Sequence, residues 1–437
     1  MHSTALLTDH YELTMVQAAL QSGTAFRHSV FELFGRRLPG GRRYGVVAGT
    51  GRVLEALASF RFDDGQLAYL RDQRVVDEPT RNWLASFSFS GNIWGYGEGD
   101  VYFPGSPLLV VESSFAEAVV LETLLLSVLN HDSAVASAAS RMVSAAEGRP
   151  CIEMGSRRTH EWSAVAAARA AYVAGFSATS NLQAGLDYGI ATRGTAAHSF
   201  TLLHDSERKA FLAQVDSLGR DTTLLVDTFD ITEAVKAAVD VAGQDLRAIR
   251  IDSGDLGELA RQVRAQLDGL GATRTEILVT GDLDEFAIAG LSAAPVDGYG
   301  VGTSLVTGSG SPTCGFVYKL VSRAASDSAD APMVAVAKKS TDKISVGGRK
   351  WALRRRNSAG VATAEVVGIE QEPIDDGNDR PLLRALVTKG EIVGLEPLEA
   401  ARQRHRSAVA ELPVESRKLS RGEPAIETEF IRSGGAR

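Results

Sequence analysis

The residues best suited to chemistry in this chain stand where a predicted strand ends and a predicted helix begins. His198 follows an extended run in the segment GTAAHSF, residues 194–200, and an apolar helical stretch comes next. Near pH 7 a neutral imidazole can act as a base, a nucleophile or a phosphate acceptor. A lone histidine is also common as a satisfied core residue or a cap. Other polar residues also stand at the ends of predicted strands, and this shared position favours a reactive histidine over a core or capping one.

Arg250, Asp252 and Asp255 lie together at the end of another predicted strand, in the segment RIDSGDL. Residues 250 and 252 face the same side of a strand, so both can point towards one site. Arginine binds a planar carboxylate or a phosphate through paired hydrogen bonds. Aspartates can hold ribose hydroxyls or a magnesium ion that bridges phosphates. The alternative is a structural ion pair, with Ser253 capping the next helix.

Three glycine-containing turns occupy similar positions, namely Gly155-Ser156-Arg157-Arg158, Gly281-Asp282 and Gly300-Val301-Gly302-Thr303-Ser304. Glycine lets backbone N–H groups approach an anion closely, and the dipole of a following helix adds a favourable field. Two arginines at a helix start are disfavoured by that dipole unless an anion is bound there. The alternative for each turn is ordinary loop chemistry. Their shared position favours binding of phosphate or carboxylate.

The elements that would position these residues alternate regularly from about residue 150. Short apolar runs near 150–154, 175–179, 190–194, 222–228, 246–252, 275–280 and 297–302 are separated by helical stretches such as EWSAVAAARAAYVAG and SFTLLHDSERKAFLAQVDSLG. This alternation predicts a parallel sheet. The number of repeats favours an incomplete or irregular (β/α) barrel of about seven to eight units over an open doubly wound sheet. A further strand is predicted near 314–321.

The remaining segments predict additional structure on both sides of the barrel. Residues 1–125 mix a helix, which Asp9 and Glu12 would cap, with glycine-rich turns and short strands, as in an α+β domain. Residues 126–330 would form the barrel. Residues 331–437 return to strands at 333–395, followed by a helix and a tail. These strands either complete the first domain or cover the barrel mouth.

Composition excludes several classes of protein. The chain has 437 residues, a net charge of −8 and 44% apolar residues, so it can bury a large core but offers no basic surface for nucleic acid or anionic lipid. Its two cysteines, Cys151 and Cys314, argue against a disulfide framework or a cysteine-built zinc site. The N-terminus lacks the pattern of a signal peptide. The most apolar helix, roughly 115–129, is too short to span a bilayer, and we expect a cytoplasmic protein without a membrane or nucleic-acid partner.

Six segments together resemble the nicotinate phosphoribosyltransferase family. They are LLTDHYELTM at 6–15, EMGSRRTHE at 153–161, GTAAHSF at 194–200, RIDSGDL at 250–256, TGDLDE at 280–285 and GYGVGTSL at 298–305. The resemblance implies synthesis of nicotinate mononucleotide and pyrophosphate from nicotinate and phosphoribosyl pyrophosphate. It also implies coupled ATP hydrolysis through a phosphohistidine, with Mg²⁺ present, in NAD salvage. The implied fold is a β/α barrel beside a mainly N-terminal domain, in a homodimer with shared active sites.

Carried over residue by residue, the resemblance implies that His198 takes the γ-phosphate of ATP and that Arg250 holds the nicotinate carboxylate. Asp252 would face the ribose or Mg²⁺, with Asp255 as a second candidate for the ion. Tyr11, from the other subunit, would stack on the pyridine ring. Met154 stands where relatives often carry an aromatic residue. The other implied substrate-binding residues are Gly155, Arg157, Thr195, Ser253, Gly281, Asp282, Gly302 and Thr303.

The charges favour the acid over the amide as substrate. A cationic Arg250 suits nicotinate, whereas nicotinamide would prefer an acceptor, and residues 176–181 contain no carboxylate. Three alternatives remain open at this stage, namely a nicotinamide-type transferase, a quinolinate-type transferase and a nucleotide-binding barrel without activity. Loss of the histidine or of the Arg-x-Asp pair would have favoured the inactive barrel, and both are present.

Overall fold

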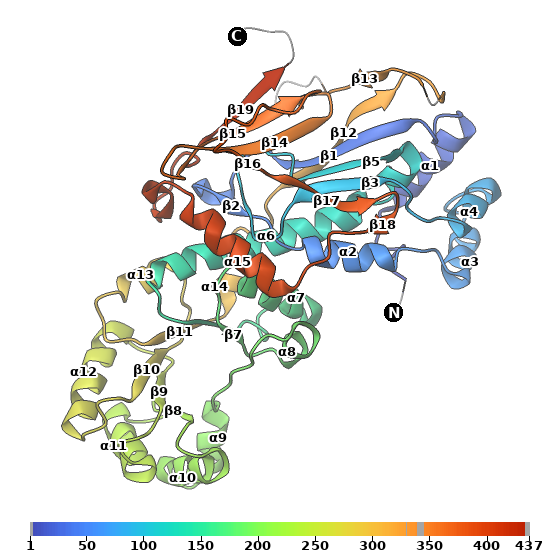
Figure 1. Ribbon diagram of the computed structural model, residues 1–437. Coiled ribbons are helices and arrows are strands. Elements are labelled where there is room, and N and C mark those ends of the chain that lie inside the picture. Colours follow the sequence, from blue (N-terminus) through green and yellow to red (C-terminus); the bar gives the residue numbers. More distant parts are fainter. Residues whose placement is uncertain (1–2, 329, 339–344, 433–437) are drawn as a thin grey trace. The chain divides into compact units, whose positions relative to one another are not determined.

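The computed structural model describes residues 3–328, 330–338 and 345–432, and the chain forms two compact units (Figure 1). Unit 1 combines Met1–Ala134 with Thr313–Arg437, and unit 2 is the intervening segment Val135–Pro312. The sequence places the boundaries near 125 and 330. Residues 339–344 lie outside the described residues; they include the end of the expected strand-like segment MVAVAKKS, residues 333–340, and the start of KISVGGRKWALRR, residues 343–355. The last five residues of the expected tail also lie outside the described residues.

Unit 2 is built on a six-stranded parallel sheet with the strand order β7-β6-β11-β10-β9-β8. The strands are β6 (Cys151–Glu153), β7 (Ala178–Thr179), β8 (Thr223–Leu225), β9 (Ala248–Ile251), β10 (Glu276–Val279) and β11 (Gly298–Val301). The order is that of an open, curled sheet with β7 and β8 at its edges, which confirms the α/β class and the incomplete barrel. Among the described residues there are six paired strands rather than seven or eight. The strand expected at 190–194 is reduced to one bridge between Thr179 and Thr192.

Helices follow the strands of unit 2, and several of them begin at a residue whose side chain accepts a hydrogen bond from a free backbone N–H group of the first turn. Asp230 caps α11 (Ile231–Ala242), Asp255 caps α12 (Leu256–Gly269) and Asn181 caps α8 (Leu182–Tyr188). The other helices are α7 (Glu161–Val173), α9 (His198–Leu203), α10 (Glu207–Leu218), α13 (Glu285–Gly290) and α14 (Thr303–Val306). The single helix expected over 199–219 is divided into α9 and α10, because Ser206 caps a new helix.

Unit 1 contains a seven-stranded sheet with the order β13-β12-β1-β5-β3-β17-β18. At its centre β1 (His28–Gly35) pairs antiparallel with β5 (Leu109–Ser114) and with β12 (Phe316–Ala324). The strand expected near 314–321 is therefore real, but it belongs to this sheet and not to the barrel. The remaining strands are β3 (Asn92–Tyr96), β13 (Met333–Ala335), β17 (Leu383–Thr388) and β18 (Glu391–Ile392).

A second sheet of unit 1 has the order β16-β14-β15-β19, and β2 (Gly45–Val46) pairs with β4 (Val101–Tyr102). Its strands are β14 (Lys350–Arg356), β15 (Ala362–Ile369), β16 (Arg380–Pro381) and β19 (Glu427–Arg432). The helices of this unit are α1 (His10–Gln21), α2 (Thr50–Ala58), α3 (Asp64–Asp72), α4 (Glu78–Ala85), α5 (Phe115–Val119), α15 (Leu398–Ala410) and the first part of α6 (Glu122–Ala145). Strands from both ends of the chain thus share one unit.

The most apolar helical segment is longer than the sequence suggests. Helices α5 and α6 form a 31-residue segment, Phe115–Ala145, which is long and apolar enough to cross a membrane by length and composition. The expectation that it is too short is wrong, because the helical stretch continues well beyond Leu129. In its most apolar window 67% of the residues are buried inside the protein, as in the core helix of a globular protein.

Candidate functional site

Polar side chains of unit 2 converge at the carboxyl ends of β8, β9 and β10, three adjacent strands of the parallel sheet. Asp227 follows β8, Asp252 and Ser253 follow β9, and Thr280 follows β10. The sequence YGIATRGTAAH brings Thr195 and His198 to the same place. Because all parallel strands point the same way, residues that follow them collect at one edge of the sheet.

His198 is held by a buried carboxylate that the sequence analysis missed. The imidazole Nε2 lies 3.0 Å from Asp227 Oδ1. The Asp227 side chain is only 2% exposed, whereas that of His198 is 41% exposed. A buried acid behind an accessible imidazole fixes the orientation of the ring and leaves the rest of the ring free to react. Asp227 stands two residues after the end of β8, close to the position that Asp252 takes after β9, and this similar position could have identified it.

Asp227 also joins the histidine to the loop after β9. Its Oδ2 accepts hydrogen bonds from the backbone N–H of Asp252 at 2.9 Å and from the hydroxyl of Ser253 at 2.8 Å. Ser253 therefore binds a carboxylate, and Asp255 rather than Ser253 caps α12. One carboxylate consequently fixes both the imidazole and the start of the Asp252 loop.

Each of the three side-chain nitrogens of Arg250 donates one hydrogen bond within the site. Its Nε donates to Thr280 Oγ1 at 2.8 Å, and its Nη1 donates to Thr195 Oγ1 at 2.7 Å. Its Nη2 donates to Asp252 Oδ1 at 2.6 Å. The Arg250 side chain is 13% exposed, so this cation is held in a partly buried position. A guanidinium has five N–H groups, and those beyond these three bonds remain able to bind an anion.

The electrostatics keep Asp252 ionised. Burial opposes its negative charge, but hydrogen bonds from Thr280 and Arg250, together with the charges of Arg250 and His198, outweigh that effect and lower the pKa of Asp252 below its usual value. An ionised carboxylate beside a guanidinium can orient ribose hydroxyls or bind a divalent cation.

The turn after β10 requires glycine. Gly281 has a φ of +112°, and a side chain there would collide with the backbone carbonyl of Asp252. This turn therefore packs directly against the Arg250–Asp252 pair. Asp282 also has a positive φ, 45°, at the same turn.

A second group of expected residues lies around β6 and β11. A side chain at Gly155 would collide with Val306 and would lie 3.1 Å from the carbonyl oxygen of Gly302, so the turn after β6 packs against α14, which Thr303 begins. Arg157 is exposed and precedes α7 in a turn. The arginines thus stand before the helix and not in its first turn.

Tyr11 belongs to unit 1, on α1, and the residue is 44% exposed. Burial of its hydroxyl, followed by the charges of Glu122, Glu12 and Asp9, raises the pKa of Tyr11 to about 12. The phenol is therefore neutral at physiological pH, and its ring is available on the surface of this unit.

Unit 1 also contains a cavity of about 800 Å³. Its lining residues are Arg36, Arg37, Leu38, Pro39, Gly40, Gly41, Thr313, Cys314 and Gly315. Two arginines beside a glycine turn would suit an anion. The Nε of Arg36 is buried without a hydrogen-bond partner within the described ranges. Burial raises the pKa of the Cys314 thiol to about 11, so this sulfur is not a ready nucleophile.

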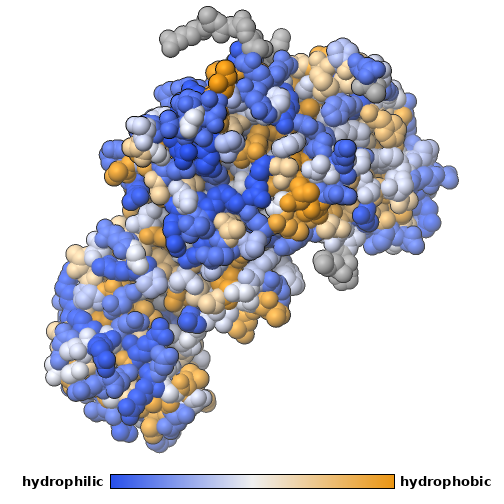
Figure 2. Space-filling model, viewed as in Figure 1, coloured by the Kyte–Doolittle hydropathy of each residue, from blue (hydrophilic) through white to orange (hydrophobic). Residues whose placement is uncertain are grey.

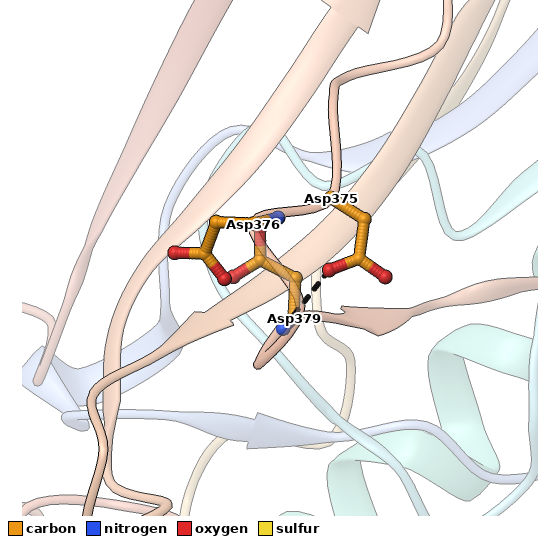
Figure 3. Close-up of side chains that lie close together, drawn as sticks. All are labelled: Asp375, Asp376 and Asp379. Atoms are coloured by element: carbon orange, nitrogen blue, oxygen red, sulfur yellow. Dashed lines mark hydrogen bonds between the residues drawn. The ribbon is translucent and has the colours of Figure 1, made fainter.

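Three carboxylates of unit 1, those of Asp375, Asp376 and Asp379, lie close together (Figure 3). Their arrangement follows from the turn itself. Asp375 accepts from the backbone N–H groups of Gly377 and Asp379, at 2.8 and 3.2 Å, and Asp379 pairs with Arg355 at 3.2 Å. The cluster carries no role in the candidate site.

Comparisons with known proteins place this geometry in a family. The model of the nicotinate phosphoribosyltransferase (NAPRTase) N-terminal domain matches residues 6–130. Nicotinate phosphoribosyltransferase pncB1 of Mycobacterium tuberculosis is 58% identical over 435 residues, which cover 98% of this chain and 95% of the relative. The chain belongs to the nicotinate phosphoribosyltransferase family.

More distant relatives and solved structures are also similar to this chain. A nicotinate phosphoribosyltransferase of Bacillus subtilis is 34% identical, with 86% of this chain and 78% of the relative covered. The crystal structure of human nicotinic acid phosphoribosyltransferase superposes with a TM-score of 0.81 at 25% identity, covering 98% of both chains. A nicotinate-nucleotide pyrophosphorylase from Pyrococcus furiosus has a TM-score of 0.76 at 23% identity, with 93% and 95% of the two chains covered, and shares the fold. Nicotinate phosphoribosyltransferase architecture therefore extends over both units of this protein.

Proposed function

We propose that this protein transfers a phosphoribosyl group from phosphoribosyl pyrophosphate to nicotinate, giving nicotinate mononucleotide and pyrophosphate, with ATP hydrolysed through a phosphohistidine at His198. The observation that carries the proposal is that one carboxylate joins the histidine to the loop of the Arg250–Asp252 pair. Asp227 binds His198 through one oxygen and the Asp252–Ser253 loop through the other. Asp227 therefore holds both the proposed phosphate acceptor, His198, and the loop that carries Asp252. A place in NAD salvage and a cytoplasmic location belong to the same proposal.

In the transfer step, the pyridine nitrogen of nicotinate attacks C1 of the ribose. The C1–oxygen bond to pyrophosphate breaks, and the leaving group carries away the bonding electron pair. The sugar develops positive character in the transition state, which an ionised Asp252 is suited to stabilise. Fixed backbone at Gly281 and Gly302 supports the ribose phosphate. Holding the pyridine nitrogen close to C1 in the right orientation removes much of the entropic cost of the reaction.

In the coupled step, the imidazole of His198 attacks the γ-phosphorus of ATP and ADP leaves. Because Nε2 faces Asp227, the ring places its proton between Nε2 and the carboxylate, which leaves the lone pair on Nδ1 as the nucleophile. The carboxylate also stabilises the positive ring that forms. Water then cleaves the nitrogen–phosphorus bond, and phosphate leaves.

Arg250 supports preference for the acid substrate. Its side chain is partly buried, so its charge is weakly screened and a carboxylate gains more from it than a neutral amide does. The facing residues Thr179, Ser180 and Asn181 offer no carboxylate for the amide nitrogen of nicotinamide. Arg157 would assist as a second cation near the base and the pyrophosphate.

The residues present fit Mg²⁺, which the proposed phosphate chemistry requires. Asp252 and Asp255 supply the oxygen ligands that this ion prefers, although Asp255 also accepts a backbone N–H as the cap of α12. A bound Mg²⁺ would neutralise charge on the pyrophosphate that departs. Lowering of the pKa of Asp252 keeps that ligand charged.

Tyr11 supports a shared-site homodimer within this proposal. The resemblance assigns its ring to the pyridine of a neighbouring subunit, and the ring is exposed on α1. Full activity from a strictly monomeric protein, measured by light scattering and assay at the same concentration, would contradict this part.

One assay tests the reaction. The protein is incubated with labelled nicotinate, nicotinamide or quinolinate, together with phosphoribosyl pyrophosphate and Mg²⁺, with or without ATP, and the mononucleotide is identified. The proposal expects product from nicotinate with stimulation by ATP. Product from nicotinamide or quinolinate instead would favour those transferases, and binding of the substrates without product would favour an inactive nucleotide-binding barrel.

A further inference from the structure

Glu153 is a buried carboxylate of unit 2 that takes no part in the chemistry proposed above. It ends β6, and the residue is 0% exposed. Burial raises the pKa of Glu153 above its usual value, although hydrogen bonds from Thr179 and Gly155 oppose that effect. Burying an acid is unfavourable unless its oxygens are satisfied, so this residue type at a strand end calls for a specific reason.

The reason lies in a closed ring of hydrogen bonds. One Glu153 oxygen accepts from the backbone N–H of Gly155, and the other accepts from the hydroxyl of Thr179. The Thr179 oxygen accepts from the backbone N–H of Asn181 at 2.9 Å, and Asn181 Nδ2 donates to Ser156 Oγ at 3.0 Å. The ring therefore returns to the residue next to Gly155.

This ring joins two loops at the carboxyl edge of the sheet. One loop runs from β6 to α7 and carries Ser156 and Arg157, and the other runs from β7 to α8 and carries Ser180 and Asn181. The ring also fixes a third element, because Gly155 packs against Val306 of α14 so closely that no side chain fits there. A double acceptor is needed at residue 153, since an apolar side chain could fill the space but could not bind both loops.

We propose that Glu153 is a positioning residue for substrate binding, which sets the Ser156–Arg157 turn against the Ser180–Asn181 loop through Thr179. This inference rests on the proposed function and extends it. Arg157 acts on the anionic substrates from a loop, and a loop holds a cation at a useful distance only when its backbone is fixed. Disturbing the ring should therefore weaken binding of nicotinate and phosphoribosyl pyrophosphate more than it slows the bound reaction.

Two substitutions open the ring from opposite sides. Glu153→Gln replaces one acceptor by a donor with the same shape. Thr179→Val removes the hydroxyl at constant volume, whereas Thr179→Ser keeps it and serves as the matched control. Asp297→Asn is a second control, because Asp297 accepts the backbone N–H of Ile277 at the opposite end of the sheet, at 2.7 Å. KM and kcat are measured for each substrate with the wild type, the single variants and the double variant, alongside thermal unfolding.

We expect KM to rise about tenfold or more in Glu153→Gln and Thr179→Val while kcat changes by less than about threefold, the size of effect that small misplacements produce. Thr179→Ser and Asp297→Asn should match the wild type. The double variant should be no worse than the poorer single variant, since both substitutions open the same ring.

Unchanged KM in both variants, additive effects, or a Thr179→Ser variant as impaired as Thr179→Val would overturn the inference. Loss of folding in both would also overturn it, because the role would then be structural. A wild type that makes no nicotinate mononucleotide would refute the proposed function instead, so the two failures are distinguishable.

Discussion

Asp227 lies 3.0 Å from the Nε2 of His198 through one carboxylate oxygen and binds the backbone N–H of Asp252 at 2.9 Å through the other. A shift of the imidazole would therefore disturb the loop that carries Asp252. The coupling of ATP hydrolysis to transfer that we propose requires communication between two such groups, and this carboxylate supplies a direct physical connection.

Asp227→Asn should slow phosphorylation of the histidine by about 100-fold or more. An amide can still contact the ring, but it cannot stabilise the positive imidazole or accept from Asp252 and Ser253 as a carboxylate does. The measurement is incorporation of acid-labile phosphate from γ-labelled ATP. Normal labelling in this variant would assign the orientation of His198 to another group.

His198→Ala should abolish stimulation by ATP and leave a slow transfer reaction. The matched control is His204→Ala, since His204 directly follows the same helix and its ring contacts only Phe200 among the side-chain contacts of the described residues, through the Phe200 carbonyl at 2.8 Å and through its ring. The ratio of initial rates with and without ATP is the measurement. Undiminished stimulation in the His198 variant contradicts the phosphohistidine role.

Arg250→Ala should raise the KM for nicotinate by about 10- to 100-fold, the range expected for a hydrogen bond between charged groups. Preference for nicotinate over nicotinamide should narrow, because the lost cation helps only the acid. Arg247→Ala, just before the same strand, is the control, since Arg247 pairs with Asp221 at the surface at 3.3 Å. If the acid-to-amide ratio is unchanged, recognition of the carboxylate lies elsewhere.

Glu207 should make stability depend on pH near neutrality. Burial, followed by the charges of Asp227 and Asp230, raises the pKa of Glu207 to about 7. Because the pKa is higher in the folded protein, stability is greatest at pH values below the pKa that Glu207 has in the unfolded chain. Stability then falls as the pH rises through about 7. Glu207→Gln removes that fall, so the variant should match the wild type at low pH and unfold roughly 2–4 °C higher at pH 8.

Thermal unfolding of both proteins between pH 4 and pH 8 provides the measurement for Glu207. A difference that stays constant across this range would show that the carboxyl group ionises normally in the folded protein. The same result would show that the charge of Asp227 does not raise the pKa of Glu207.

Much of unit 2 could be predicted because its signals are local. Each strand of its sheet falls within or next to an apolar run, and Asp, Ser or Asn caps mark the start of most of its helices, α8 and α10 to α13. The sequence predicts helices between successive strands but does not locate the short helix α8, whose seven residues are too few to show a helical period. The strand-end positions of His198, Arg250 and Asp252 predict that the three residues lie together, and hydrogen bonds to Asp227 and within the Arg250–Asp252 pair do bring them to one place. Asp227 was missed because its importance depends on the histidine that folds against it.

Unit 1 could be predicted less completely because its pairing is long-range. Nothing local in β1 indicates that Phe31 will lie opposite Leu320, or that Phe31 will stack on Tyr318 with ring centres 4.9 Å apart. The resulting core joins residues from both ends of the sequence. Surface composition gave little guidance either, since hydrophilic and hydrophobic side chains are interspersed on the face that Figure 2 shows.

The pairing of β1 with β12 has a consequence for biosynthesis. During synthesis on the ribosome, β1 cannot pair with β12 until all of unit 2 has been made, because unit 2 lies between the two strands in the sequence. Unit 2 is contiguous and can mature during that interval. We therefore expect ribosome-bound chains that are just long enough for residue 312 to have left the ribosome to protect unit 2 from protease, while their leading segment is still digested.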